Sequence, residues 1–256
     1  MTTNNSVSVL GVKIFNLSQK EALTLIETWL QDTLMTRSIF IVNAHTLNLA
    51  KDDSQYRVVL NSANRVFADG TGARWAARLR GVRLKDNLVG TDLIPHLFAK
   101  TANRGNRYFL LGAHPDTVSR AARKCETAFK GWSLAGFHHG YIGESETPDV
   151  IAKINSAKPN LLLVAMGNPL QEHWIHNHQH QLRVPVCVGV GGLFDHWAGN
   201  LQRAPAWIRE RGFEWLQILL QQPHKWRRYL LGNPKFLLRI ISELPRDLAN
   251  SNKTKY

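Results

Sequence analysis

Short apolar runs alternate with longer amphipathic segments through the middle of this 256-residue chain. The runs lie at residues 108–112, 132–137, 161–166 and 186–190, and the segments between them have helical length and spacing. Strands that alternate with helices of about 10–15 residues are joined by right-handed crossovers and pair in parallel. Proline near the first turn of three of these helices supports their boundaries. The alternation therefore predicts an α/β fold with a mainly parallel sheet.

The first hundred residues follow the same pattern. A strand or hairpin is expected at 7–14, a helix at 17–34 with Ser18 as its N-cap, and a helix at 53–61. Two further strands are expected at 38–42 and 65–68, and they run into Asn43-Ala44-His45-Thr46 and Asp69-Gly70-Thr71-Gly72. Each predicted strand therefore ends in a polar turn.

Two later turns are rich in glycine and amides. One is Met166-Gly167-Asn168-Pro169-Leu170-Gln171-Glu172, and the other is Gly189-Val190-Gly191-Gly192-Leu193-Phe194-Asp195. Ligands of open α/β sheets bind at the carboxyl ends of the strands, where glycines and helix N-termini accept phosphates. These turns predict a small-molecule site, with a phosphate-bearing ligand as the expected occupant.

Positive charge is concentrated at the C-terminus. The formal net charge is +13, and residues 203–256 hold eleven Lys and Arg against four Asp and Glu. Such a basic region needs an anionic partner, which can be nucleic acid, an anionic membrane or a phosphorylated substrate. Cys125 and Cys187 lie far apart, each in a run that is typical of a helix or a buried strand, and are expected to be reduced core residues of a cytoplasmic protein. The sequence shows neither a secretory signal nor an apolar run as long as a membrane span.

Beyond Asp195 the chain reads as a helical appendage in which tryptophans interleave with basic residues. Near its end, Leu237, Leu238, Ile240 and Ile241 beside Lys235 and Arg239 form an amphipathic helix with a basic border. Such a helix suits the surface of an anionic membrane. The alternative is a C-terminal helix that packs on the core.

Asp69 is the sharpest catalytic candidate, because it follows an apolar strand and precedes two glycines that leave room for a ligand. A carboxylate in this position can accept a proton from a hydroxyl nucleophile, whereas the alternative role is an N-cap. Asn43 and Thr46 are candidates for binding sugar hydroxyls, with an Asx turn as the alternative. Asp195 contacts a nucleotide or caps the following turn.

Several enzyme classes lack their motifs in this sequence. It has no HExxH pattern, serine nucleophile elbow, Walker loop or GxGxxG fingerprint. A nucleotide-sugar epimerase or dehydrogenase stays open as an alternative, although it needs NAD and the fingerprint is missing. A nucleic-acid-binding protein also stays open, because basic residues interleaved with aromatics can bind bases and phosphates.

The motifs as a set resemble the WecB/TagA/CpsF glycosyltransferases, which make bacterial cell-surface polysaccharides. The resemblance covers residues 8–242 in order, through Val42-Asn43-Ala44-His45-Thr46-Leu47-Asn48, Ala68-Asp69-Gly70-Thr71-Gly72, Gly90-Thr91-Asp92-Leu93, Phe109-Leu110-Leu111-Gly112, both amide- and glycine-rich turns, Arg203-Ala204-Pro205, Gly212-Phe213-Glu214-Trp215-Leu216 and the segment 227–234. Some members have Thr, Arg and Arg where this chain has Ile41, Asn87 and Ile218.

This resemblance implies a Rossmann-like domain, with helices on both faces of the sheet, that transfers a sugar with inversion and without metal or cofactor. The donor is a UDP-sugar, commonly of the N-acetylmannosamine type, and the acceptor is a polyprenyl-diphosphate-linked sugar. Asp69 is the implied base, Asn43 and Gln171 orient the sugars, and Lys225 and Arg228 stabilise the leaving diphosphate. Further binding residues are expected at Thr46, Gly70, Thr71, Gly112, Gly167, Asn168, Gly191, Gly192 and Asp195.

Three segments follow from these expectations. Residues 1–196 form the glycosyltransferase domain, 197–245 a basic, Trp-rich appendage that closes the active site, docks on the membrane or does both, and 246–256 a disordered tail. The expected location is the cytoplasmic face of the cell membrane, with the enzyme peripheral to it. A homo-oligomer is possible, and nucleic acid is not an expected partner.

Overall fold

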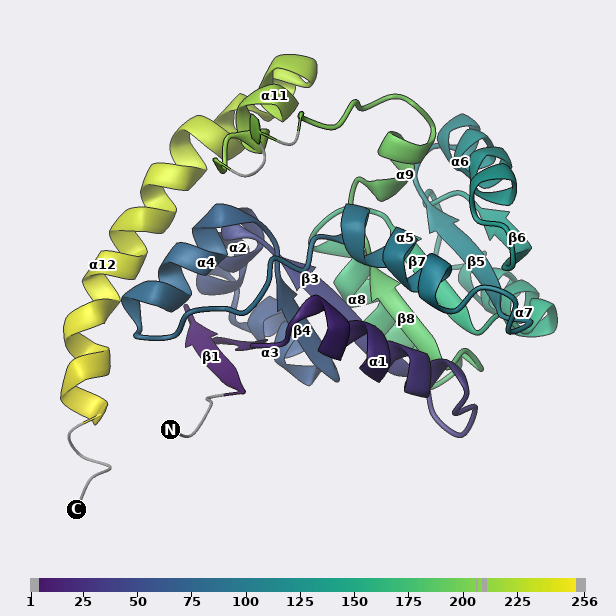
Figure 1. Ribbon diagram of the computed structural model, residues 1–256, viewed down its shortest axis with the longest axis horizontal. Coiled ribbons are helices and arrows are strands. Elements are labelled where there is room, and N and C mark those ends of the chain that lie inside the picture. Colours follow the sequence, from purple (N-terminus) through teal and green to yellow (C-terminus); the bar gives the residue numbers. More distant parts are fainter. Residues whose placement is uncertain (1–4, 206, 209–210, 252–256) are drawn as a thin grey trace.

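A six-stranded parallel sheet forms the centre of the computed structural model, which describes residues 5–205, 207–208 and 211–251 (Figure 1). The strand order is β4-β3-β8-β7-β5-β6, and β1 and β2 form a separate antiparallel hairpin. All five pairings within the large sheet are parallel, which confirms the predicted α/β fold. The strands are β1 (Ser6–Val9), β2 (Val12–Phe15), β3 (Arg37–Val42), β4 (Arg65–Ala68), β5 (Arg107–Gly112), β6 (Ser133–His138), β7 (Leu161–Ala165) and β8 (Val186–Gly189).

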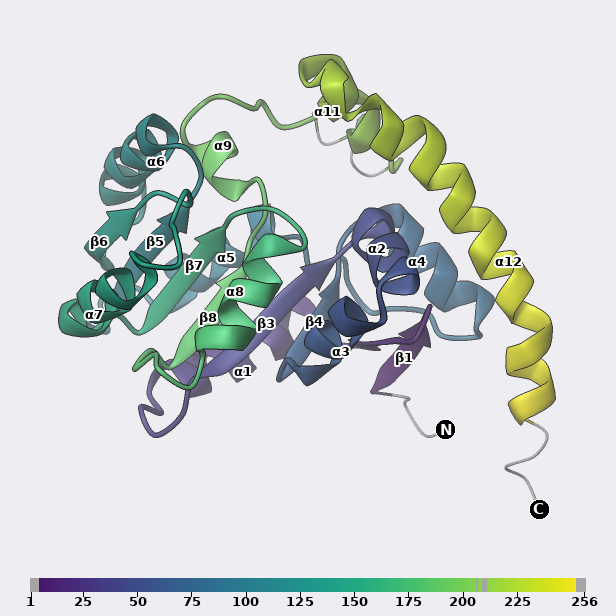
Figure 2. The same cartoon turned by 180° about the vertical axis from the view of Figure 1, so that it is seen from behind.

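Helices cover both faces of this sheet (Figures 1 and 2). One face packs against α1, α5, α6 and α9, and the other against α2, α3, α4, α7 and α8. The helices are α1 (Gln19–Leu30), α2 (Ala44–Asp52), α3 (Ser54–Ser62), α4 (Gly70–Leu79), α5 (Gly90–Lys100), α6 (Pro115–Ala128), α7 (Thr147–Ala157), α8 (Leu170–His178) and α9 (Leu193–Trp197).

Strand β3 shows why the sheet needs cover on both sides. Phe40 and Val42 belong to one apolar core cluster, whereas Ile39 and Ile41 belong to the cluster on the opposite face. Successive side chains of a strand point to opposite faces of the sheet. A strand with apolar residues at consecutive positions can therefore bury all of them only if helices cover both faces. The near-continuous apolar runs in the sequence therefore specify a sandwiched, parallel sheet.

Helix α1 begins as predicted and ends earlier than predicted. Ser18 and Glu21 form a capping box, in which each side chain accepts a hydrogen bond from the other residue's backbone. The helix ends at Leu30 rather than near residue 34, because Asp32 Oδ1 accepts a hydrogen bond from the Leu34 amide and holds a turn there. Leu34 is consequently 94% exposed.

The strand order brings four polar turns together. The neighbouring strands β4, β3, β8 and β7 all end at one edge of the sheet. Asp69 follows β4, Asn43 follows β3, the segment Val190-Gly191-Gly192 follows β8, and Met166-Gly167-Asn168 follows β7. Segments separated by more than a hundred residues in the sequence thus face the same space.

The appendage closes over this edge and then returns along the domain (Figure 1). Its elements are α11 (Glu214–Gln221), the 3₁₀ turn η1 (Pro223–Lys225), the π-helical turn η2 (Arg227–Leu231) and the long helix α12 (Gly232–Ser251). Helix α12 packs on α2 and α4 and places Phe236 and Ile240 in the main core cluster. The appendage is therefore anchored to the domain by burial at its C-terminal end.

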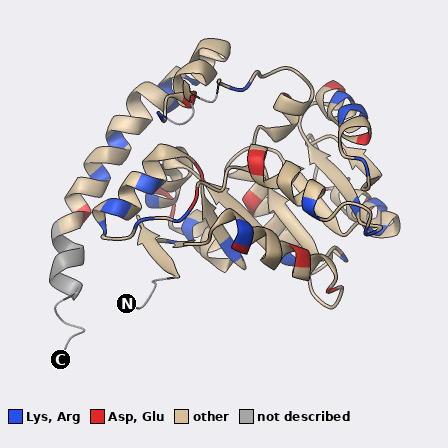
Figure 3. Ribbon diagram, viewed as in Figure 1, with Lys and Arg blue, Asp and Glu red and all other residues tan. Residues whose placement is uncertain are grey.

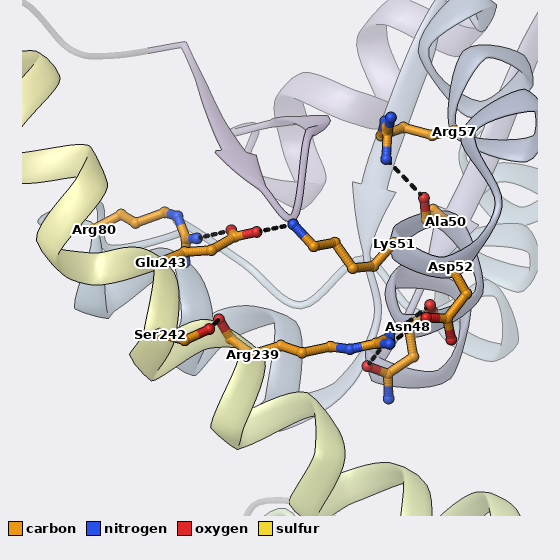
Figure 4. Close-up of polar contacts among 9 residues, drawn as sticks. All are labelled: Asn48, Ala50, Lys51, Asp52, Arg57, Arg80, Arg239, Ser242 and Glu243. Carbon is orange, nitrogen blue, oxygen red and sulfur yellow. Dashed lines mark hydrogen bonds and ion pairs between the residues drawn. The ribbon is translucent and has the colours of Figure 1, made fainter.

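Polar contacts reinforce this anchor (Figure 4). Arg239 and Lys235 both pair with Asp52 of α2, and Glu243 pairs with Lys51 of α2 and with Arg80 at the end of α4. Lys235 and Arg239 were expected to form the basic border of a lipid-facing helix. This expectation is wrong for both residues, because each pairs with Asp52 of the domain. Ile240 is buried beside them instead of being exposed. Figure 3 shows basic residues along both α12 and the adjoining α4.

Helix α12 continues to Ser251, so the segment 246–251, expected to belong to a disordered tail, is helical. Residues 252–256 lie outside the described residues. In the described ranges, none of the helices has the length and apolarity needed to cross a membrane.

Candidate active site

A cavity of about 750 Å³ lies between the carboxyl edge of the sheet and the appendage. Its floor comes from the turns after β4, β3, β8 and β7, and its roof from the segment that follows α9. The predicted site residues that line it are Asn43, Asp69, Gly70, Thr71, Gly167, Asn168, Gln171, Gly191, Gly192, Asp195, Lys225 and Arg228. Two parts of the chain that are distant in sequence therefore contribute to one cavity, as the family resemblance implies.

Asp69 lies directly before α4 and makes no side-chain cap hydrogen bond to it. The carboxylate of Asp69 therefore does not cap the helix, which was the alternative role considered for it. Asp69 lines the cavity instead. Burial and, next, the negative charge of Glu214 raise the pKa of Asp69, and Arg228 and Arg203 oppose this rise, so that the resulting pKa is about 6. A carboxylate with this pKa is mostly ionised at neutral pH and takes up a proton more readily than an exposed aspartate.

The turn that carries Asp69 is held from two sides. Gly70 has a φ of +82° and donates its backbone N–H to Asn87 Oδ1 at 2.8 Å. On the appendage side, a Cβ placed on Gly212 would lie 2.3 Å from Thr71 Oγ1, so only glycine allows this close approach. Asn87, one of the departures from the family pattern, thus supports the backbone next to the candidate base. Ile41 and Ile218, the other two departures, line the cavity.

Lys225 and Arg228 form a cationic wall contributed by the appendage. Both line the cavity, and the guanidinium of Arg228 lies over the Tyr229 ring. Arg228 Nε is buried and has no hydrogen-bond partner in the described part of the chain. Burial and the neighbouring Arg228 lower the pKa of Lys225. The unpaired N–H of Arg228 Nε and the two positive charges of Lys225 and Arg228 favour the binding of an anionic ligand at this wall.

His45 lines the same cavity and is close enough to Arg228 and Lys225 for their charges to act on it. Burial, followed by Arg228 and Lys225, lowers its pKa to about 4. The imidazole is therefore neutral at physiological pH and can donate or accept a hydrogen bond without adding charge. The sequence alone did not give His45 a role, because its position relative to the appendage depends on the fold.

An ion pair connects the appendage to the domain near Asp69. Arg203 binds both carboxylate oxygens of Asp92 on α5, with 2.8 Å between Nη2 and Oδ2, and its Nε lies 3.8 Å from Glu214 Oε1. In the sequence, Arg203, Asp92 and Glu214 belong to motifs of the family resemblance, and the motifs alone indicate no role for them. Here they fix the start of α11 over the cavity, where Glu214 acts on the charge of Asp69.

Gln171 connects two of the turns. Its Nε2 donates to Glu172 Oε1 at 2.7 Å, and its Oε1 accepts the backbone N–H of Gly191 at 3.0 Å. Asn168 Nδ2 donates to the same Glu172 oxygen at 2.6 Å. Burial raises the pKa of Glu172 and its hydrogen bonds with Gln171, Tyr56 and Asn168 offset part of the rise, so that the resulting pKa is about 7. Sequence reasoning missed Glu172, although its place beside Gln171 in the turn motif was a usable signal.

Three predicted residues have structural roles. Asn43 Oδ1 accepts the backbone N–H groups of His45 and Thr46, so the Asx-type cap considered for it exists, although Asn43 also lines the cavity. Thr46 is fully buried and is absent from the cavity lining. Gly112 is also absent from the lining, and a Cβ there would lie 2.3 Å from the Ala165 carbonyl oxygen. Thr46 and Gly112 therefore serve packing.

Asp195 is at the first turn of α9, and its Oδ1 accepts a hydrogen bond from Asn200 at 3.1 Å. Asp195 also lines the cavity, so one of its oxygens binds the following loop while the side chain borders the space for the ligand.

Across residues 5–205, 207–208 and 211–251, no group of three or more His, Cys, Asp or Glu is arranged to hold a metal ion. Cys125 and Cys187 are free and buried, as expected.

Comparison with known proteins agrees with this geometry. A sequence model described as the glycosyl transferase WecG/TagA/CpsF family matches residues 7–249. The N-acetylglucosaminyldiphosphoundecaprenol N-acetyl-beta-D-mannosaminyltransferase of Bacillus subtilis (strain 168) is 33% identical over 205 residues, which are 80% of this chain and 79% of that protein. A protein of the same name from Staphylococcus aureus (strain MW2) is 32% identical over 238 residues, or 91% of each chain. The similarity thus includes both the sheet and the appendage.

Proposed function

Because the chain belongs to the WecG/TagA/CpsF family of glycosyl transferases, we propose that it moves a sugar from a UDP-sugar to a polyprenyl-diphosphate-linked sugar during cell-surface polysaccharide synthesis. The donor sugar is of the N-acetylmannosamine type or a related hexose or uronic acid. The names of the relatives support an acceptor that carries N-acetylglucosamine on a diphosphoundecaprenol. Family membership disfavours the two alternatives, an epimerase or dehydrogenase and a nucleic-acid-binding protein.

The observation that carries this proposal is that the carboxylate of Asp69 and the cationic wall of Lys225 and Arg228 line one cavity. Asp69 takes the proton of the acceptor hydroxyl, the hydroxyl oxygen attacks the anomeric carbon, and the bond from that carbon to the diphosphate breaks. The electron pair leaves with UDP, and Lys225 and Arg228 offset the negative charge that develops there. A single displacement of this kind inverts the anomeric configuration and requires no metal ion.

The remaining residues of the cavity orient the two sugars. Asn43 follows β3, the neighbour of the strand that leads to Asp69, and Gln171 lies in the first turn of α8; both line the cavity. Gly167, Gly191 and Gly192 leave the backbone open to the ligand. A Cβ on Gly167 or Gly191 would meet nothing within 4 Å, so these glycines border free space rather than packed atoms. This openness supports close approach of the nucleotide to the turns.

The decisive experiment is UDP release by the purified protein from a panel of UDP-sugars, with and without a short polyprenyl-diphosphate-linked N-acetylglucosamine. The expected result is acceptor-dependent UDP release together with a mass gain of one sugar on the lipid. The matched control is Asp69→Asn, which keeps the size of the side chain and removes the base. Absence of release with every pair, with no thermal shift from UDP, would contradict the proposal.

We also propose that the appendage docks the enzyme on an anionic membrane, which would place it on the cytoplasmic face where lipid-linked acceptors are found. Leu230, Leu231, Leu238 and Ile241 are between 52% and 69% exposed on η2 and α12. Leu237, 40% exposed on the same helix, lines the cavity, so the apolar surface continues to the ligand space. Partial burial of such leucines in the lipid interface favours binding.

The membrane proposal is tested by sedimentation with phosphatidylglycerol vesicles. Changing Leu231 and Leu238 together to Glu is expected to reduce the bound fraction severalfold, because two apolar contacts become repelled charges. Leu34→Glu is the matched control, since Leu34 is equally apolar and 94% exposed but lies in the loop between α1 and β3. Equal binding by the double variant and the control would contradict docking through α12.

A further inference from the structure

Glu172 is a buried carboxylate that lies behind the wall of the cavity. It is 0% exposed and is not among the lining residues. Within the described residues it has no ion pair with a Lys or Arg, and three neutral donors surround it instead. These are Asn168 Nδ2 and Gln171 Nε2 at its Oε1, and the Tyr56 hydroxyl, at 3.0 Å, at its Oε2. Burying an ionisable group is costly, so this arrangement requires a reason.

The carboxylate determines which way the two amides face. An ionised carboxylate only accepts hydrogen bonds, and a proton taken up at Oε2, beside the Tyr56 hydroxyl, still leaves Oε1 an acceptor. The amide atoms directed at Oε1 must therefore be nitrogens in either protonation state. For Gln171 the opposite end agrees, because the Gly191 N–H is a donor and requires the amide oxygen. The orientation of Gln171 is therefore fixed from both ends. That of Asn168 is fixed from one end by the bond from its Nδ2 to Glu172, close to the Tyr56 hydroxyl, and among the described residues no hydrogen bond to its Oδ1 is found.

We infer that Glu172 is a positioning residue, which turns Asn168 so that its carbonyl oxygen serves the ligand as an acceptor and locks Gln171 across the turns after β7 and β8. This inference rests on the proposed function, and it adds a chemical polarity to the cavity. The oxygen of Asn168 accepts a ligand hydroxyl or N–H, such as those of a sugar. Lys225 and Arg228, which line the same cavity, bind the anion.

Two substitutions at Glu172 separate orientation from charge. Glu172→Gln keeps Oε1 in place for both amides, and its new nitrogen faces the Tyr56 hydroxyl, which can accept instead of donate. Glu172→Asp keeps the charge but withdraws the acceptor by one methylene. We expect kcat/KM to be at least about tenfold lower in Glu172→Asp than in Glu172→Gln, which corresponds to the loss of one or two hydrogen bonds to a charged group.

A role that is only structural makes different predictions. Tyr56→Phe is the matched control, because it removes the third hydrogen bond of Glu172 and leaves the two amides bound. We expect it to lower Tm while kcat/KM stays within about threefold of the wild type. If Glu172→Asp and Glu172→Gln both behave in this way, or if Glu172→Asp is the more active of the two, the inference is wrong.

A double-mutant cycle tests whether Glu172 acts through Asn168. In an Asn168→Ala background, the loss of kcat/KM caused by Glu172→Asp is expected to shrink at least about threefold, because the side chain that it positions is gone. An undiminished loss would overturn the inference, since independent residues have additive effects.

A measurement without turnover separates this inference from the proposed function. In ¹⁵N-labelled protein, the side-chain amide protons of Asn168 and Gln171 are expected to exchange slowly with solvent in the wild type and in Glu172→Gln, and faster in Glu172→Asp. If the wild type transfers no sugar but these exchange rates follow the expected order, the proposed function fails and the positioning by Glu172 stands. Equal exchange in all three proteins would refute the positioning.

Discussion

Replacing Asp69 with asparagine is expected to stabilise the protein while it abolishes turnover. Burial raises the pKa of this carboxyl from 3.8 to about 6, which means that the folded environment disfavours its charge. At about 1.4 kcal/mol for each pKa unit, an ionised Asp69 lowers the free energy of unfolding by at most about 3 kcal/mol. The amide of Asn has nearly the same shape and no charge, so Asp69→Asn removes this cost.

The gain depends on pH in a defined direction. A carboxyl with a raised pKa in the folded state costs stability in full above pH 6, and the cost disappears as pH falls toward 3.8, where Asp69 is protonated in both states. At pH 8 the variant is expected to unfold with a free energy up to about 3 kcal/mol higher, which raises Tm by up to roughly 10 °C. At pH 4 the two proteins are expected to be nearly equal.

Urea denaturation at pH 8 and pH 4 measures this difference. Asp116→Asn is a suitable control, because the Asp116 side chain is 65% exposed and pairs with Arg120, one helical turn away. It should change stability by less than about 1 kcal/mol at both pH values. An Asp69→Asn protein that is less stable than the wild type at pH 8 would refute the reasoning, since it would mean that the ionised carboxylate stabilises the fold.

Two further changes test how the appendage and the sheet are held. Phe236→Ala is expected to lower the free energy of unfolding by about 3–5 kcal/mol in a urea titration, because Phe236 is 2% exposed in the core cluster beneath α12, whereas Leu238→Ala, at a position 69% exposed, should cost little. Gly112→Ala is expected to give no folded protein by circular dichroism, because its Cβ would lie 2.3 Å from the Ala165 carbonyl oxygen at a φ of +138°. Gly167→Ala, with free space around its Cβ, should cost about 1–2 kcal/mol, the cost of a φ of +79°; equal losses for the two glycine variants would contradict this packing argument.

The sheet could be predicted from the sequence because its signals are local. A buried parallel strand is a run of apolar residues, and a ligand-binding turn carries glycine and amides at its end, so Asn43, Asp69 and Gln171 were found without coordinates. The strand order was not predictable from these local patterns. In this order β3 and β8 are neighbours, so Asn43 at the end of β3 and Gly191 after β8 line the same cavity.

The misplaced expectations involve contacts between distant segments. The amphipathic pattern of α12 is compatible with packing against lipid or against the domain. Lys235 and Arg239 face the domain because both pair with Asp52 on α2, a contact that the sequence pattern of α12 does not show. Gly112 was expected to be a binding residue, yet a Cβ there would meet the backbone of Ala165, so the close approach is between β5 and β7. Glu172 was overlooked because carboxylates are usually exposed, and its place beside Gln171 in the turn motif, the one usable signal, does not by itself show that it is buried.

The most direct test of the account is the pH dependence of kcat/KM for sugar transfer, since this quantity reports the protonation state of the base in the free enzyme. With Asp69 as the base, kcat/KM should be level above about pH 7 and fall about tenfold for each pH unit below an apparent pKa near 6, where Asp69 takes up a proton. Asp69→Asn should lack this acid limb and retain little activity at any pH. A wild-type profile that stays level down to pH 5, or an Asp69→Asn enzyme with the same acid limb and comparable activity, would contradict the assignment of Asp69 as the base.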